Sequence, residues 1–183
     1  MRVLGISGSL RRGSHNTSLL REAGRHMRDG VEYAIYDGLR EIPPYDEDLD
    51  AEGTPAAVAD LKRAITEADG VLFATPEYNS SIPGQLKNAL DWGSRPLATN
   101  SFRNKPVAVI SSSAGAFGGV WAAAELRKVL GAMGARVTEA ELAVGHAAEK
   151  FDEHGRLADE DVRQGLREAL ATLVAEVPTA VAA

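Results

Sequence analysis

The sequence predicts an α/β protein with a five-stranded parallel sheet and helices on both faces of the sheet. Two observations support this prediction: strand-like apolar runs alternate five times with helical patterns, and the runs at 3–6 and 70–75 are apolar enough for strands buried on both faces. Strands that alternate with helices pair in parallel through right-handed crossovers. We expect a single domain over 1–177 and a frayed tail over 178–183.

Each element has its own local signal. The first strand contains Val3, Leu4 and Ile6, and a cap at Asn16 or Thr17 opens a helix that runs to Asp29. The other expected strands are 31–36, 70–75, 106–111 and 136–144. A second helix is expected to begin at 54–55, and further helices are expected over 85–92, 120–133 and 159–177. The segment 37–53 is expected to be a long loop, either functional or covering a sheet edge.

Composition and charge exclude several classes of protein. The 183 residues contain no cysteine, which excludes disulfides, a thiolate nucleophile and a thiolate-bound metal or iron–sulfur site. A net charge of -6 argues against nonspecific nucleic-acid binding. No apolar run approaches the ~20 residues of a membrane span, and the N-terminus lacks a signal-peptide pattern, so we expect a cytoplasmic protein. The four histidines are dispersed, and we expect no metal site.

The loop that leaves the first strand has the composition of an anion site. Residues 7–17 are rich in hydroxyls, amides and guanidiniums, and they lead into a helix N-terminus whose N–H groups and dipole favour negative charge. Arg11 or Arg12 can bind two phosphate oxygens in a fork. The loop matches neither the nucleotide triphosphate nor the dinucleotide glycine fingerprint. It therefore indicates a terminal phosphomonoester, with a plain polar turn as the alternative.

Two further loops follow the third and fourth strands. Residues 76–84 combine stiffening prolines with donors, acceptors and the ring of Tyr78, and they can read the edge of a planar heterocycle. Residues 112–119 are small and glycine-rich, which permits close approach of backbone to a flat ligand. The alternatives are a capped turn and an ordinary glycine turn. All three loops lie at the carboxyl edge of the sheet, where such folds bind ligands.

No nucleophile is paired with a base in these loops. Ser9 and His15 share the first loop, but no orienting acid accompanies them, and a phosphate-lining role explains both residues. A phosphate seat and a ring-reading loop without a catalytic dyad indicate that a bound cofactor performs the chemistry.

Three segments of the sequence resemble, in order, the NADPH-dependent FMN reductases, which include bacterial quinone, chromate and azo-dye reductases. These segments are GISGSLRRGSHNTSLL, PEYNSSIPGQLKNALDW and SSSAGAFGGVWAAAELRKVL. The resemblance covers roughly 1–144. It implies a flavodoxin-like three-layer sandwich with strand order 2-1-3-4-5 and a non-covalent FMN. The cofactor-binding residues are then Ser9, Arg11, Ser14, Asn16 and Thr17 for the phosphate, and Pro76, Glu77, Tyr78, Asn79, Ser80, Ser112, Ser113, Gly115 and Gly118 for the ring.

The resemblance also implies an activity. NADPH or NADH would donate a hydride to FMN N5, and a quinone or a similar azo, nitro, chromate or free-flavin acceptor would then take the electrons by ping-pong kinetics. Family members form homodimers or homotetramers. We therefore expect helix 85–92 in an interface, because Leu86, Leu90 and Trp92 give it apolar surface on two sides. An electron-carrier flavodoxin and a non-enzymatic FMN-binding module are the alternatives.

Overall fold

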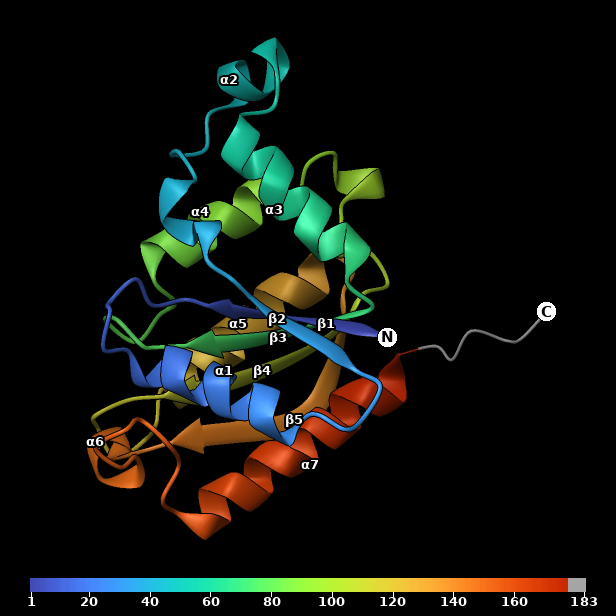
Figure 1. The fold of residues 1–183 in the computed structure, drawn as a ribbon. Helices are drawn as coiled ribbons and strands as arrows, with labels where there is room; N and C mark the ends of the chain where they lie inside the picture. The colour runs from blue at the N-terminus through green and yellow to red at the C-terminus, as the bar shows by residue number, and fades with distance from the viewer. Residues whose placement is uncertain (178–183) are drawn as a thin grey trace, which may run out of the picture.

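The computed structural model describes residues 1–177 and contains a five-stranded sheet in the order β2-β1-β3-β4-β5 (Figure 1). Every neighbouring pair of strands is parallel. The predicted fold class and strand order are confirmed. The strands are β1 (Arg2–Ser7), β2 (Glu32–Tyr36), β3 (Gly70–Thr75), β4 (Pro106–Ser112) and β5 (Arg136–Val144). The predicted frayed tail, 178–183, lies outside the described residues.

Helices cover both faces of the sheet and give three layers (Figure 1). One face packs against α1 and α7, and the other packs against α3, α4 and α5. The main helices are α1 (His15–His26), α3 (Ala56–Glu67), α4 (Gly84–Gly93), α5 (Val120–Ala132) and α7 (Glu160–Glu176). Shorter helical segments are η1 (Gly38–Glu41), α2 (Glu47–Glu52), η2 (Leu97–Thr99) and α6 (Ala147–Lys150).

The two layers follow from the alternation of side chains along each strand. In β3, Val71 and Phe73 enter the core under α3, α4 and α5, whereas Leu72 and Ala74 enter the core under α1 and α7. Successive residues of a strand point to opposite faces, so a strand buried on both faces must be apolar throughout. All six residues of β3 are buried.

The segment 37–53 differs from the long loop that the sequence predicts. It contains the 3-10 helix η1 and the short helix α2, whose first turn is capped by the Asp46 side chain accepting from the Asp48 N–H at 2.9 Å. Leu39 and Ile42 are buried against the sheet layer, while α2 buries none of its residues. In Figure 1, α2 lies above α3 and α4, and the start of the segment lies beside α4.

Helix α4 does not present the apolar surface from which we predicted an interface. Leu86, Leu90 and Trp92 are all buried within the chain itself. The Trp92 indole N–H donates to the Pro43 carbonyl at 2.9 Å, and its ring meets Tyr45 edge-on at 4.9 Å. The 37–53 segment therefore covers this side of α4, and the argument for an interface through Trp92 is wrong.

No helix among residues 1–177 is long and apolar enough to cross a bilayer. The expected cytoplasmic location stays a prediction.

Candidate functional site

The loop between β1 and α1 offers a run of unused backbone donors. Ser14 caps α1, with its hydroxyl accepting from the Thr17 N–H at 3.4 Å, so the helix begins earlier than the predicted caps Asn16 or Thr17. Within residues 1–177, the five backbone N–H groups from Arg12 to Asn16 have no protein acceptor. A helix N-terminus with unsatisfied donors and a positive dipole end is a seat for an anion.

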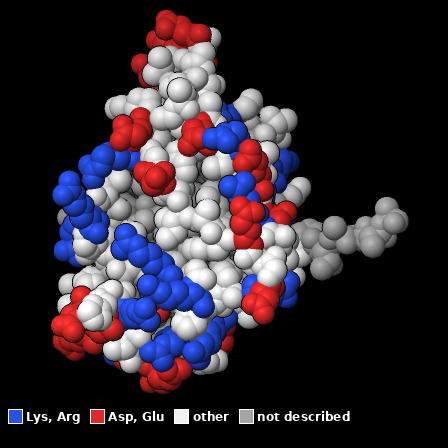
Figure 2. All heavy atoms as spheres, in the orientation of Figure 1, with Lys and Arg blue, Asp and Glu red and all other residues white. Residues whose placement is uncertain are grey.

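Arg11 adds charge to this loop. Its guanidinium donates to the Gly13 carbonyl at 2.7 Å, which closes the loop on itself. Arg11 and Arg12 are both exposed. Figure 2 shows Lys and Arg side chains gathered over this loop and over α1, although the net charge of the whole chain is negative.

Asn16 joins this loop to the end of β4. Its side-chain amide donates to the Ser112 carbonyl at 2.9 Å and accepts from the Ser112 N–H at 2.9 Å. Asn16 is buried, and this pair of bonds uses both ends of its amide. The side chain therefore holds two loops together, and the backbone N–H of Asn16 stays available to a ligand.

The loop after β3 is fixed from two directions. Asn79 and Ser80 have φ of 53° and 59° in a tight turn closed by two backbone hydrogen bonds between Tyr78 and Ser81. Glu77 reaches α5, where one carboxylate oxygen accepts from the Trp121 and Ala122 N–H groups at 3.1 Å each. Helix α5 starts after Gly119 with no side-chain cap of its own, so Glu77 supplies that cap from another loop.

The glycine-rich loop after β4 packs against the end of β5. The Ser113 N–H donates to the Val144 carbonyl at 3.0 Å, and Gly115 accepts from the His146 N–H at 3.1 Å. Gly118 has φ of +64°, and a Cβ there would lie 2.6 Å from the backbone of Ala143. The close approach that requires glycine at this position is therefore to the protein's own backbone.

The three loops enclose a cavity of about 350 Å³ at the carboxyl edge of the sheet. This volume is within the usual range of small-molecule sites. Nine predicted site residues line it: Ser9, Arg11, Ser14, Asn16, Pro76, Glu77, Tyr78, Ser112 and Ser113. Sequence reasoning did not include Ala114, which has no chemical signal, and it weighed His15 without selecting it as a site residue.

The other five predicted residues do not line this cavity. Thr17 lies on the neighbouring side of the loop, where its hydroxyl is 2.9 Å from that of Ser7. Asn79 and Ser80 form the exposed tip of their turn, and Gly115 and Gly118 belong to the packed loop described above. The roles predicted for these five in cofactor binding stay predictions.

His15 connects the cavity to the segment before α7. Its ring stacks on Phe151, with centroids 5.4 Å apart. Burial, together with the nearby Arg11 guanidinium, lowers the pKa of His15 from its usual value of 6.5. The neutral ring is therefore favoured at neutral pH.

Two features test whether these residues fit a phosphorylated planar cofactor such as FMN. The Ser112 hydroxyl is buried at the cavity and has no hydrogen-bond partner among the described residues. A buried polar atom without a partner costs free energy that a ligand atom can recover. Ser14, His15 and Asn16, which carry three of the unused N–H groups, line the same cavity, and the residues therefore fit a ligand with an anionic end and a polar heterocycle.

The fold and this strand-edge cavity place the chain among flavodoxin-like proteins with a ligand site beyond the carboxyl ends of β1, β3 and β4. The sequence model of the NADPH-dependent FMN reductases matches residues 1–149. The chain belongs to this family of oxidoreductases, which use FMN and NAD(P)H.

Individual relatives agree with this family over almost the whole chain. An NAD(P)H-dependent FMN reductase of Pseudomonas aeruginosa is 42% identical, with 94% of this chain and 93% of the relative covered. An NADPH:quinone oxidoreductase of Arabidopsis thaliana is 39% identical, covering 96% and 91%. Among solved structures, FerB, a flavoenzyme NAD(P)H:(acceptor) oxidoreductase from Paracoccus denitrificans, superposes with a TM-score of 0.87 at 34% identity, covering 96% of each chain.

Proposed function

We propose that this chain binds FMN in the strand-edge cavity and reduces quinones, or similar azo, nitro, chromate or free-flavin acceptors, with NADPH or NADH. The observation that carries the proposal is the run of unpaired N–H groups from Arg12 to Asn16. Its last three residues line one cavity with Ser112, whose hydroxyl has no partner among the described residues. The relatives include quinone reductases of Pseudomonas putida and Escherichia coli, which supports the choice of acceptor.

The chain's own residues have three tasks in this proposal. The N–H groups of residues 12–16 and the Arg11 guanidinium hold the phosphate, because charge-assisted bonds are the strongest available to an exposed loop. Pro76, Glu77 and Tyr78 lie against the ring, and Glu77 fixes their loop by capping α5. Ser112 and Ser113 complete the cavity floor at the end of β4.

FMN, when bound, would supply the redox chemistry by accepting a hydride at N5 from NAD(P)H and passing two electrons to the acceptor. A catalytic acid or base from the chain is not part of the proposal. Donor and acceptor would use the same open side of the cavity in turn, which gives ping-pong kinetics.

The purified protein tests this proposal directly. We expect a yellow protein with flavin absorbance that oxidises NADPH or NADH when a quinone is present. Removal of FMN should abolish the activity, FMN addition should restore it, and a chelator should leave the rate unchanged. A yellow protein that does not turn over would indicate an electron carrier or a flavin-binding module instead, and a colourless protein that binds no added FMN would refute the cofactor assignment.

Self-association as a homodimer or homotetramer also stays a proposal. Its support in this chain is the pair Phe117 and Trp121, which are 67% and 50% exposed and meet edge-on with centroids 5.1 Å apart. Exposed aromatic side chains are enriched in protein interfaces. Light scattering that gives a monomer mass at every concentration would contradict this proposal.

A further inference from the structure

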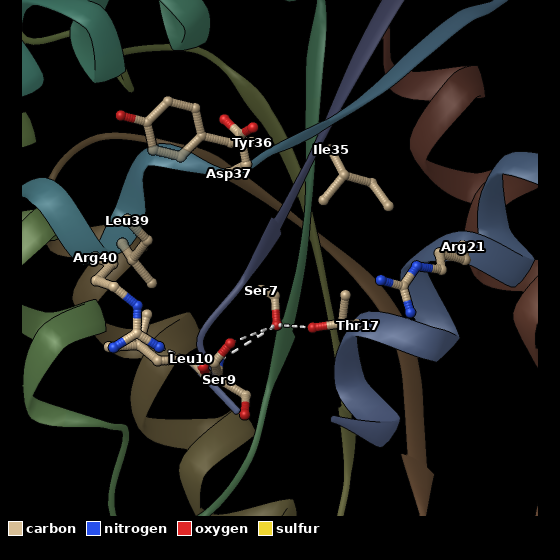
Figure 3. Close-up of a pocket in the computed structure, with 10 residues that line it drawn as sticks. All are labelled: Ser7, Ser9, Leu10, Thr17, Arg21, Ile35, Tyr36, Asp37, Leu39 and Arg40. Atoms are coloured by element: carbon tan, nitrogen blue, oxygen red, sulfur yellow. Dashed lines mark hydrogen bonds between the residues drawn. The ribbon is translucent and has the colours of Figure 1, made fainter. Parts of the chain in front are cut away.

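A second cavity, of about 330 Å³, lies on the other side of the loop that follows β1 (Figure 3). It is formed by the ends of β1 and β2, the first turns of α1, and η1. The two cavities share Ser9, which shows that a single loop separates them. The function proposed above does not use this second cavity.

The lining combines three kinds of group. Apolar side chains form its walls, and three hydroxyls lie at its base, where the Ser7 and Thr17 hydroxyls are 2.9 Å apart. Charged groups stand at the rim: Arg21 on α1, and Asp37 and Arg40 after β2. In Figure 3 the two arginines approach from opposite sides of the cavity. An apolar interior with a few convergent polar groups is typical of a small-molecule site.

The charge at the rim is not neutralised internally. Neither Arg21 nor Arg40 lies within ion-pair distance of any carboxylate among residues 1–177, although Asp37 lines the same cavity. Arg40 donates to the Leu10 carbonyl at 2.7 Å through one nitrogen, which positions the side chain and leaves its other N–H groups available. Two guanidiniums and one carboxylate give the rim a net positive charge, so an anionic ligand is favoured.

We propose that this second cavity binds the adenosine end of NADPH, with the 2′-phosphate held by Arg21 and Arg40. This inference rests on the proposed function, since it places the donor of the same reaction. Asp37 immediately follows β2. In dinucleotide-binding Rossmann folds, an acidic residue after the second strand accepts from the ribose 2′-hydroxyl of NAD, whereas a nearby arginine accommodates the 2′-phosphate of NADP. Arg40, three residues after Asp37, is placed by analogy to accommodate the 2′-phosphate, and Asp37 is placed to accept from a free 2′-hydroxyl.

The cavity therefore sets the preference between NADPH and NADH. The arginines favour the nucleotide that has the extra phosphate, because a guanidinium binds phosphate oxygens in pairs. The Asp37 carboxylate acts in the opposite direction, because it repels a 2′-phosphate and accepts from the free 2′-hydroxyl of NADH. Substitutions on the two sides of the rim should move the NADPH-to-NADH ratio in opposite directions.

The test measures nucleotide binding separately from turnover. Adenosine 2′,5′-bisphosphate is titrated calorimetrically into the FMN-loaded protein and its variants. We expect Arg21→Ala and Arg40→Ala each to raise the dissociation constant tenfold or more and to leave FMN affinity unchanged. Arg28→Ala, an exposed arginine after the same helix and outside this cavity, is the matched control and should bind as the parent does.

Steady-state kinetics give the second readout. The ratio of kcat/KM for NADPH to that for NADH should fall about tenfold in the arginine variants and rise in Asp37→Asn. Arg40→Ala also removes the bond to the Leu10 carbonyl and could disturb the loop after β1. Arg21 is exposed on α1, so Arg21→Ala tests the inference without that disturbance.

Three results would overturn the inference. The bisphosphate could bind equally well to the parent and the arginine variants, kcat/KM could fall equally for NADPH and NADH, or the variants could lose FMN. A protein that oxidises neither nucleotide would refute the proposed function instead. The calorimetric titration would then still decide whether the cavity binds a 2′-phosphorylated nucleotide.

Discussion

Asn16 and Ser112 are joined by two hydrogen bonds of 2.9 Å, in which the amide of Asn16 both donates to and accepts from the backbone of Ser112. The two residues are 96 positions apart in the chain, and both are buried. This pair fixes the first turn of α1 to the end of β4. The loop proposed for the phosphate and the strand end proposed for the ring are thereby held as one unit.

We predict that Asn16→Ala lowers the free energy of unfolding by about 2–3 kcal/mol, because two hydrogen bonds are lost and two buried backbone groups remain unpaired. Asn16→Asp should be at least as destabilising, since a carboxylate cannot donate to the Ser112 carbonyl. Urea denaturation measures the effect. Ser18→Ala, on the same helix, is the control. An Asn16→Ala protein as stable as the parent that merely loses FMN would show that the amide serves the ligand.

Arg11→Ala is expected to weaken FMN binding about ten- to a hundredfold, since a charge-assisted contact with a phosphate is worth roughly 1.5–3 kcal/mol. Arg11 lines the strand-edge cavity and is exposed, so its removal should leave the fold intact. Arg12→Ala is the matched variant and should have the smaller effect, because the Arg12 side chain does not line that cavity. Equal FMN dissociation constants for Arg11→Ala and the parent would refute the phosphate assignment.

Glu77→Ala is expected to lower the free energy of unfolding by about 1–2 kcal/mol, the usual cost of a lost helix cap. The variant should also weaken FMN binding, because the loop that contains Tyr78 loses its attachment to α5. Glu77→Gln keeps an acceptor without the charge and should recover part of both losses. Glu149→Ala, which removes an exposed acid, is the control for surface charge. Unchanged stability in Glu77→Ala would show that α5 needs no cap from this loop.

The strands could be predicted because their signal is local. The apolar run 70–75 coincides with β3 to the residue, and the expected strand 136–144 coincides with β5. The loops that follow β1, β3 and β4 meet at one edge, as parallel topology requires. The segment 37–53 could not be predicted in the same way. Helix α2 spans six residues and buries none of them, so it has no periodic apolar pattern to recognise.

The roles of side chains at the candidate site could not be predicted for a different reason. The family resemblance implies that the side chains of Asn16 and Glu77 contact the cofactor, whereas in the structure their polar atoms bond to distant backbone. Trp92 shows the same limit, because an apolar residue on a helix is equally suited to a core and to an interface. Only the tertiary arrangement, here the 37–53 segment packed on α4, distinguishes the two.

His15 should make the stability of the FMN-free protein depend on pH. Burial and Arg11 lower its pKa in the folded state, so the unfolded chain binds more protons at mildly acidic pH. The stabilisation from the neutral ring is complete above about pH 6.5 and is lost as the pH falls through the lower folded-state pKa. We expect His15→Gln to reduce this loss of stability, with His154→Gln in an exposed turn as the control. Because burial also lowers the pKa of His26, a smaller dependence should remain. If the His15→Gln protein kept the full pH dependence of stability, a group other than His15 would be responsible for it.

The two substrates are expected to bind in turn. If donor and acceptor use one open side of the strand-edge cavity in turn, initial rates measured against both substrates should give parallel double-reciprocal lines. The second cavity allows a further test, because Arg21 and Arg40 would hold only the adenosine end of the donor and would not contact the acceptor. The arginine variants should therefore raise KM for NADPH without changing KM for the quinone, and their lines should stay parallel. Intersecting lines would mean that both substrates are bound together, and the shared-side mechanism would have to be abandoned.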